Sequence, residues 1–112
     1  MLDANWLFSL ATVAETLPPA AEPMRFAIAA AHGTMTLGLY APRGVDVQTP
    51  HAQDELYVVA TGSGTFEKNG ERRAFAAQDV IFVEAGATHR FEDVSDDFSA
   101  WVVFWGPPGG ER

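Results

Sequence analysis

Short apolar runs separated by turn residues dominate this chain. The sequence contains no long apolar stripe of helical period, and residues 7–17 allow only a short helical turn. Asn69-Gly70 separates two of the runs, and Asn-Gly is a strong hairpin signal because both residues tolerate positive φ. The pattern predicts an all-β, antiparallel sandwich or barrel. The expected strands are Met24–Ala31, Thr34–Tyr40, Glu55–Ala60, Thr65–Glu67, Arg72–Phe75, Val80–Val83, Thr88–Glu92 and Phe98–Trp105.

Three of these strands are apolar at consecutive positions, so both of their faces are apolar: 56–59, 80–83 and 101–105. A barrel wall in contact with water would alternate apolar and polar residues. We therefore expect the outer face to be covered, in part by an N-terminal arm of residues 1–23 and more simply by a second subunit. The predicted layout is this arm, a barrel over 24–106, a flexible tail over 107–112, and a homodimer.

Composition narrows the classes of partner. The 112 residues suit one domain, with 47% hydrophobic and 20% charged residues. A net charge of −8 disfavours nucleic acid and anionic membranes, since both need a basic surface. No cysteine is present, which excludes disulfides and thiolate chemistry and suits a reducing compartment. Without a basic leader or a membrane-length apolar run, the expected location is cytoplasmic.

Two histidines and a glutamate stand at the edges of these strands. Residues two apart share a face of a strand, so His51 and Glu55 face the same way as Tyr57, and His89 faces the same way as Phe91 and Asp93. Two imidazoles and a carboxylate suit a divalent transition metal. Taken singly, His51 has a plainer interpretation as a surface residue, His89 as a hydrogen-bonded core residue and Glu55 as a solvated strand end.

The spacing of these residues resembles two short motifs of the cupin superfamily. In the first, His51, Glu55 and Gly62 match with the family's gaps, Gly44 lies one residue from the expected glycine, and Thr49 replaces the first histidine. In the second, Gly86 and His89 match, while Gln78 replaces a glycine, Glu84 a proline and Asp93 an asparagine. Together the motifs span about residues 40–105, and the chain resembles a small, single-domain cupin of the RmlC-like jelly-roll type.

The resemblance implies an antiparallel double-stranded β-helix, or jelly-roll barrel, that binds Fe, Mn, Ni or Zn through His51, Glu55 and His89. A full site of this family has a further histidine, here Thr49. Gln48 or Gln53 could donate an amide oxygen in its place, and Pro50 could distort the strand enough to turn Gln48 inward.

The resemblance also implies a range of activities, since cupins include oxygenases and isomerases. We expect a metal-dependent enzyme of one of these kinds that acts on a small organic substrate, partly apolar or carbonyl-bearing, with Glu55 or Asp93 moving protons. The alternative is a non-catalytic module that binds a small ligand or a metal in a degenerate site. In either case the expected pocket is lined by Thr49, Tyr57, Phe82, Phe91 and Phe104.

Overall fold

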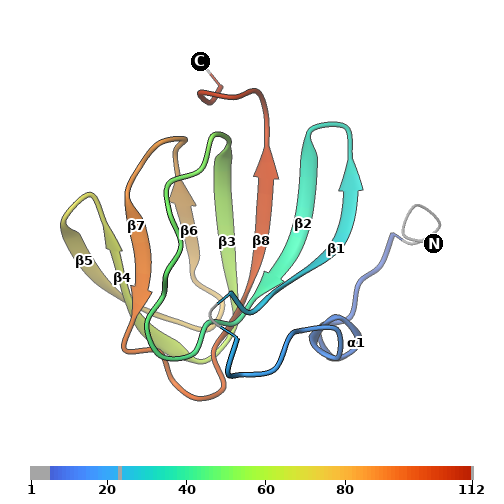
Figure 1. Ribbon diagram of the computed structural model, residues 1–112, viewed down its shortest axis with the longest axis vertical. Coiled ribbons are helices and arrows are strands. Elements are labelled where there is room, and N and C mark those ends of the chain that lie inside the picture. Colours follow the sequence, from blue (N-terminus) through green and yellow to red (C-terminus); the bar gives the residue numbers. More distant parts are fainter. Residues whose placement is uncertain (1–5, 23, 112) are drawn as a thin grey trace.

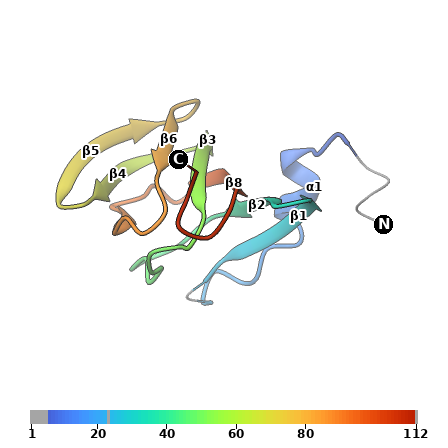
Figure 2. The same cartoon turned by 90° about the horizontal axis from the view of Figure 1, so that it is seen from above.

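Two antiparallel sheets face each other across one core (Figures 1 and 2). The computed structural model describes residues 6–22 and 24–111, and within them the chain forms one short helix and eight strands. The larger sheet has the order β1 (Phe26–His32), β2 (Met35–Tyr40), β8 (Ser99–Trp105), β3 (Asp54–Thr61) and β6 (Val80–Val83). The smaller sheet has the order β5 (Glu71–Ala76), β4 (Ser63–Lys68) and β7 (His89–Glu92).

The all-β jelly-roll prediction is confirmed, and each expected strand is present with its ends shifted by at most two residues. The Asn69-Gly70 turn joins β4 to β5, with φ of 51° and 88° at its two residues, as the hairpin signal requires. The short helical turn expected in residues 7–17 is α1 (Leu10–Ala14), and the Ser9 side chain caps it by accepting from the Thr12 amide at 3.2 Å.

Aromatic rings fill the space between the sheets. Phe91 of β7 lies at the centre of this core, with its ring centroid 4.8 Å from Phe66, 4.9 Å from Tyr57 and 4.8 Å from Phe98. Tyr57, Phe91 and Phe98 are almost completely buried. These side chains come from both sheets, so the core fixes the spacing between β3 and β7, which carry the site described below.

The outer face of the larger sheet is apolar as well. The strand register places its outward residues in two rows across β6, β3, β8 and β2. The N-terminal arm covers one end of these rows, where Leu39 is fully buried against Val13 of α1, whereas Val80 and Phe82 at the other end are 59% and 48% exposed. The predicted arm is described over residues 6–22 only; residues 1–5 and 23 lie outside the described residues. The rows are Phe82, Leu56, Val103 and Leu37, and Val80, Val58, Trp101 and Leu39.

The segment expected as a flexible tail, 107–112, makes specific hydrogen bonds within the residues that the structure describes, 107–111. The amide of Gly109 donates to the carbonyl of Ala52 at 2.8 Å. The buried carboxylate of Asp54 accepts from the amides of Glu111 and Ala85, both at 2.9 Å, and these bonds lower the pKa of Asp54. The tail is therefore tied to the start of β3 and to the loop before β7. Arg112 lies outside the described residues.

Because Phe91 lies at the centre of the core, its removal should destabilise the fold strongly. Phe91→Ala should lower the free energy of unfolding by about 3–5 kcal/mol, because it removes a buried ring and leaves a cavity among other rings. Trp6→Ala is the control, since this aromatic ring is 86% exposed and lies outside the core, and it should cost about 1 kcal/mol or less. Urea unfolding of both variants measures the difference; equal losses would contradict this description of the core.

Candidate metal centre

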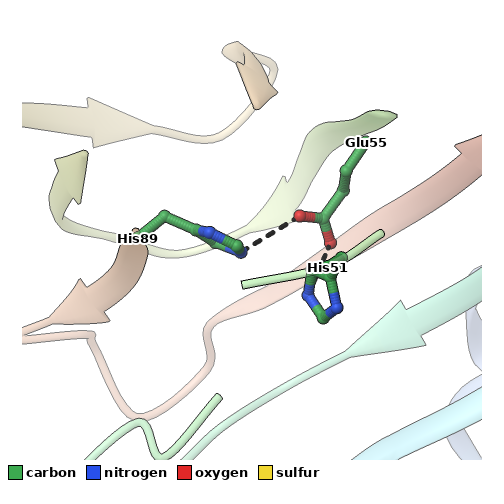
Figure 3. Close-up of side chains that lie close together, drawn as sticks. All are labelled: His51, Glu55 and His89. Carbon is green, nitrogen blue, oxygen red and sulfur yellow. Dashed lines mark ion pairs between the residues drawn. The ribbon is translucent and has the colours of Figure 1, made fainter. Parts of the chain in front are cut away.

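Three side chains, one from each sheet and one from the segment that precedes β3, point toward one another (Figure 3). His51 lies in the segment before β3, Glu55 is the second residue of β3, and His89 begins β7 in the opposite sheet. One potential ligand atom of each residue lies within 4.8 Å of those of the other two. The residues that the sequence singled out as the ligand set are therefore together in space.

Glu55 and His89 are both about 99% buried as side chains, with Glu55 Oε1 and His89 Nε2 3.1 Å apart. Neither atom has a well-oriented hydrogen-bond partner among the described residues. Burying an ionised carboxylate without a partner costs several kcal/mol. This is a large part of the free energy of unfolding of a small domain. A positive charge between these two atoms, a shared proton or a metal ion, would supply that compensation.

The backbone carbonyl of Ala87 sets the tautomer of His89. Its Nδ1 lies 2.9 Å from the carbonyl of Ala87, which can only accept, so Nδ1 carries the proton and donates it. In the neutral ring Nε2 then presents a lone pair to Glu55, as a histidine ligand to a metal does. Burial lowers the pKa of His89, but the adjoining Glu55 carboxylate and the Ala87 carbonyl outweigh it and raise the pKa above its ordinary value.

His51 completes the cluster from the solvent side. Its side chain is 28% exposed, and its Nε2 lies 3.7 Å from Glu55 Oε2. Its ring packs edge-on against Phe104 at a centroid distance of 4.9 Å. Burial lowers the pKa of His51 despite the attraction of Glu55, so the ring is neutral near pH 7 and its lone pair is free to bind a metal.

Gln48 lies beside the cluster, on the wall of the same cavity as His51 and Glu55. Its side-chain oxygen lies 3.4 Å from His51 Nε2 and accepts from the Tyr57 hydroxyl at 3.0 Å. Thr49 is exposed. The side-chain nitrogen of Gln53 donates to the carbonyls of Thr34 and Gly106, both at 3.0 Å, outside the cluster. Of the three candidates in this stretch, the structure brings Gln48 to the site.

A buried carboxylate that the sequence analysis missed lies behind Gln48. Asp46 is 6% exposed and accepts from the Gln48 side chain at 2.7 Å, the Phe91 amide at 2.8 Å and the Tyr40 hydroxyl. Burial and the bond to Asp46 raise the pKa of Tyr40. The sequence held no signal for it, because alternation of Val45, Asp46 and Val47 would place the valines inward, whereas in the structure the valines are 77% and 49% exposed.

A cavity of about 100 Å³ adjoins the cluster. Gln48, His51, Glu55 and Tyr57 reach it, and the rest of its wall is apolar or aromatic. Among the described residues, no lysine or arginine lines this cavity. The space suits a molecule of a few non-hydrogen atoms that carries no strong negative charge, and the remaining wall consists of Met24, Phe26, Tyr40, Val102 and Phe104.

Several expected pocket residues lie elsewhere. Phe82 is on the outer side of β6, 48% exposed and 5.4 Å from the Lys68 ammonium, because the inward positions of that strand are Ile81 and Val83. Phe91 is buried in the aromatic core beneath the cavity and does not line it. Thr49 is exposed and is absent from the cavity wall, whereas Tyr57 and Phe104 line it as expected.

Asp93 is also outside the cluster. It is exposed at a turn with a φ of 52°, which ends β7 and turns the side chain out of the strand's alternation. Asparagine, the family's residue at this position, adopts this backbone region with little strain, and aspartate does so next most readily. Gln78, which replaces a motif glycine, likewise has a φ of 79°. Both motif positions are thus explained by backbone shape, and the structure does not bring Asp93, expected as a catalytic residue, to the cluster.

Comparison with known proteins agrees with this architecture. The cupin domain family matches residues 36–105. An uncharacterized protein of Streptomyces coelicolor is 41% identical over 76 residues, which are 66% of this chain and 71% of that protein. The chain therefore belongs to the cupin domain family.

Solved structures show the same fold at low identity. A Cupin 2 conserved barrel domain protein from Salinispora arenicola has a TM-score of 0.69 at 20% identity, covering 91% of this chain and 89% of that one. A variant of Streptomyces PAC13 with uridine has a TM-score of 0.65 at 15% identity, covering 96% and 84%. In the described part of this chain, no helix has the length and apolarity needed to span a bilayer. The cytoplasmic location stays a prediction.

The raised pKa of His89 predicts an opposite pH dependence for the metal-free and metal-loaded protein. The protonated pair with Glu55 stabilises the metal-free fold below the ordinary histidine pKa of about 6.5, and this stability is lost as the pH rises through the higher folded value. Metal must displace that proton, so the rise in melting temperature caused by metal should grow over the same interval above about pH 6.5.

Thermal unfolding with and without Zn²⁺, from about pH 6 to about pH 8, measures both effects, because this interval starts just below the ordinary histidine pKa of about 6.5 and extends above it. His89→Gln should remove them, whereas His32→Gln is the control, because His32 is exposed at the end of β1 and should change neither. A metal effect that is independent of pH would contradict this assignment of the proton.

Proposed function

We propose that this cupin binds one divalent transition metal through His51, Glu55 and His89, with the oxygen of Gln48 as a fourth ligand. The observation that carries the proposal is the pair of buried atoms, Glu55 Oε1 and His89 Nε2, which face each other without an oriented hydrogen-bond partner in the described residues. Two imidazoles with oxygen donors suit Fe, Mn, Ni or Zn.

The proposed activity is that of a metal-dependent enzyme, oxygenase- or isomerase-like, on a small organic substrate. A bound metal supplies Lewis acidity and open coordination positions. The chain supplies the rest: a cavity of about 100 Å³ that limits substrate size, apolar walls that exclude water, and the Tyr57 hydroxyl. Burial and the nearby Glu55 charge raise the pKa of Tyr57, so its hydroxyl stays protonated and donates to the Gln48 side-chain oxygen at 3.0 Å.

The cavity also favours one class of substrate. Because the described wall has no lysine or arginine, a phosphate or a second carboxylate would find no cationic partner there. A small neutral molecule with a carbonyl or hydroxyl group suits both the apolar wall and the metal. One solved neighbour, Streptomyces PAC13, was crystallised with uridine, which is a neutral molecule, although it is larger than this cavity.

Metal content tests the binding proposal directly. Protein purified without chelators or metal-affinity steps should contain close to one equivalent of a transition metal by elemental analysis. His89→Ala should lower the metal affinity about 100-fold or more, because it removes a ligand. Changing a residue that only supports a ligand typically costs about 10–100-fold. His32→Ala is the matched control and should retain full occupancy; equal occupancy in both variants would contradict the site.

Turnover separates the enzyme from the alternative, a non-catalytic binding module. Small neutral hydroxy-carbonyl and diketone compounds should be consumed by the metal-loaded protein, with dioxygen uptake for an oxygenase or with a rearranged product by NMR for an isomerase. The His89→Ala variant should be inactive. Binding of these compounds at the metal with no chemical change would favour the binding module, for which the small number of polar groups in the cavity is the supporting observation.

We also propose a homodimer, formed through the uncovered part of the outer sheet face. Val80 and Phe82 are 59% and 48% exposed, and they continue the apolar rows that the arm buries at the other end. A dimer of ordinary size would bury about 1,600 Å² in total. Residues along these rows are neutral, so this face avoids the repulsion expected between two chains of charge −8.

Sedimentation velocity at tens of micromolar tests the dimer. The wild-type chain should sediment as a dimer, and Phe82→Asp should convert it to a monomer, because it places a charge in the proposed interface. Ile28→Asp is the control: Ile28 is 57% exposed on β1, outside the proposed interface, and its replacement should leave the dimer intact. A monomeric wild-type chain would refute the proposal.

A further inference from the structure

Asp46 occupies an unusual position for a carboxylate. It lies in the segment before β3, is 6% exposed, and is joined by hydrogen bonds to both sheets. Tyr40 of β2 donates its hydroxyl, and Phe91 of β7 donates its backbone amide at 2.8 Å. Gln48 donates twice, from its backbone amide at 3.2 Å and from its side chain at 2.7 Å. The carboxylate is thus fully satisfied and held on several sides.

This carboxylate decides which end of the Gln48 amide faces the metal centre. An ionised carboxylate only accepts, so the side-chain NH₂ of Gln48 must face Asp46. The oxygen at the other end must then face His51 Nε2, at 3.4 Å, and the Tyr57 hydroxyl, at 3.0 Å. The reverse orientation would set the amide oxygen against the Asp46 carboxylate and lose the bond from Tyr57.

We infer that Asp46 is a positioning residue for the metal centre, which fixes Gln48 so that its carbonyl oxygen, the end able to bind a cation, points at the ligand cluster. This inference rests on the proposed metal site and goes beyond it, because Asp46 does not itself touch the cluster. An amide nitrogen has no lone pair to offer a metal, so the orientation of Gln48 determines whether a fourth ligand exists. Partners of metal ligands typically act in this way.

A double-mutant cycle on metal affinity tests the coupling. Asp46→Asn keeps the shape but puts a donor beside the Gln48 amide, and it should weaken Zn²⁺ binding about 10–100-fold. Gln48→Ala should weaken it to a similar extent. If Asp46 acts through Gln48, Asp46→Asn should have little further effect in the Gln48→Ala background. Asp79→Asn is the control, because Asp79 is exposed and accepts from the Ala76 amide away from the cluster.

The outcomes separate this inference from the proposed function. A wild-type protein that binds no metal at its three main ligands refutes the proposed function. Metal binding that is lost on His89→Ala but unchanged on Asp46→Asn overturns only the inference. Equal and additive losses from Asp46→Asn with and without Gln48 also overturn it, because a general loss of structure would act independently of Gln48.

A measurement on the wild-type chain serves if Asp46→Asn does not fold. In ¹⁵N NMR spectra, the side-chain NH₂ protons of Gln48 should exchange slowly with solvent and should remain protected when Zn²⁺ is added, because the bond to Asp46 persists while the oxygen binds the metal. Rapid exchange in both states, or loss of protection on addition of Zn²⁺, would overturn the inference.

Discussion

The burial of one carboxylate, that of Glu55, is the constraint on which the site depends. Its side chain is 1% exposed in an aromatic barrel, and its Oε1 faces His89 Nε2 at 3.1 Å. A negative charge in such surroundings needs a positive partner, and the Ala87 carbonyl holds the His89 proton on the far side of the ring. The position between these two atoms suits either a proton or a metal ion, and under the proposed function the two compete for it.

The core packing and the loops hold Glu55 and His89 in this arrangement. Glu55 and His89 belong to different sheets, so their separation depends on the packing of Phe91, Tyr57 and Phe66 between β3 and β7. The loops around the site are tied as well. The Gly86 amide donates to the His51 carbonyl at 2.9 Å, and Asp54 joins the C-terminal residues to the loop that precedes β7. Core packing and loop hydrogen bonds together hold a site whose charged centre is costly to bury.

Much of this architecture could be predicted from the sequence. Apolar runs and the Asn69-Gly70 turn specify strands through local periodicity and backbone preference, which depend on neighbouring residues alone. His51, Glu55 and His89 followed from alternation on strands and from motif spacing. Phe82 shows where this reasoning fails: its strand is apolar on both faces, so the pattern did not show which face points inward. The strand register, a tertiary property, decides it.

Asp46, Gln48 and Asp93 show a second limit. The motif put Thr49 at the place of the missing histidine and in the pocket, but this segment is not a regular strand, and Gln48 faces the cluster instead. Asp46 became significant only when Tyr40, Gln48 and Phe91, distant in sequence, were seen around it. Asp93 has the chemistry of a proton carrier, yet a turn with positive φ directs it to solvent. Irregular segments carry Gln48, the proposed fourth ligand, and Asp46 behind it, and periodicity says least about such segments.

The most direct test of the central claim is an anomalous diffraction experiment on crystals of protein purified without chelators or added metal. We expect one strong anomalous peak, at the absorption edge of a single transition metal, within bonding distance of Glu55 Oε1 and His89 Nε2 and adjacent to His51 and Gln48. A direct hydrogen bond between Glu55 and His89 at neutral pH, with no anomalous peak there after soaking in Zn²⁺ or Mn²⁺, would contradict it.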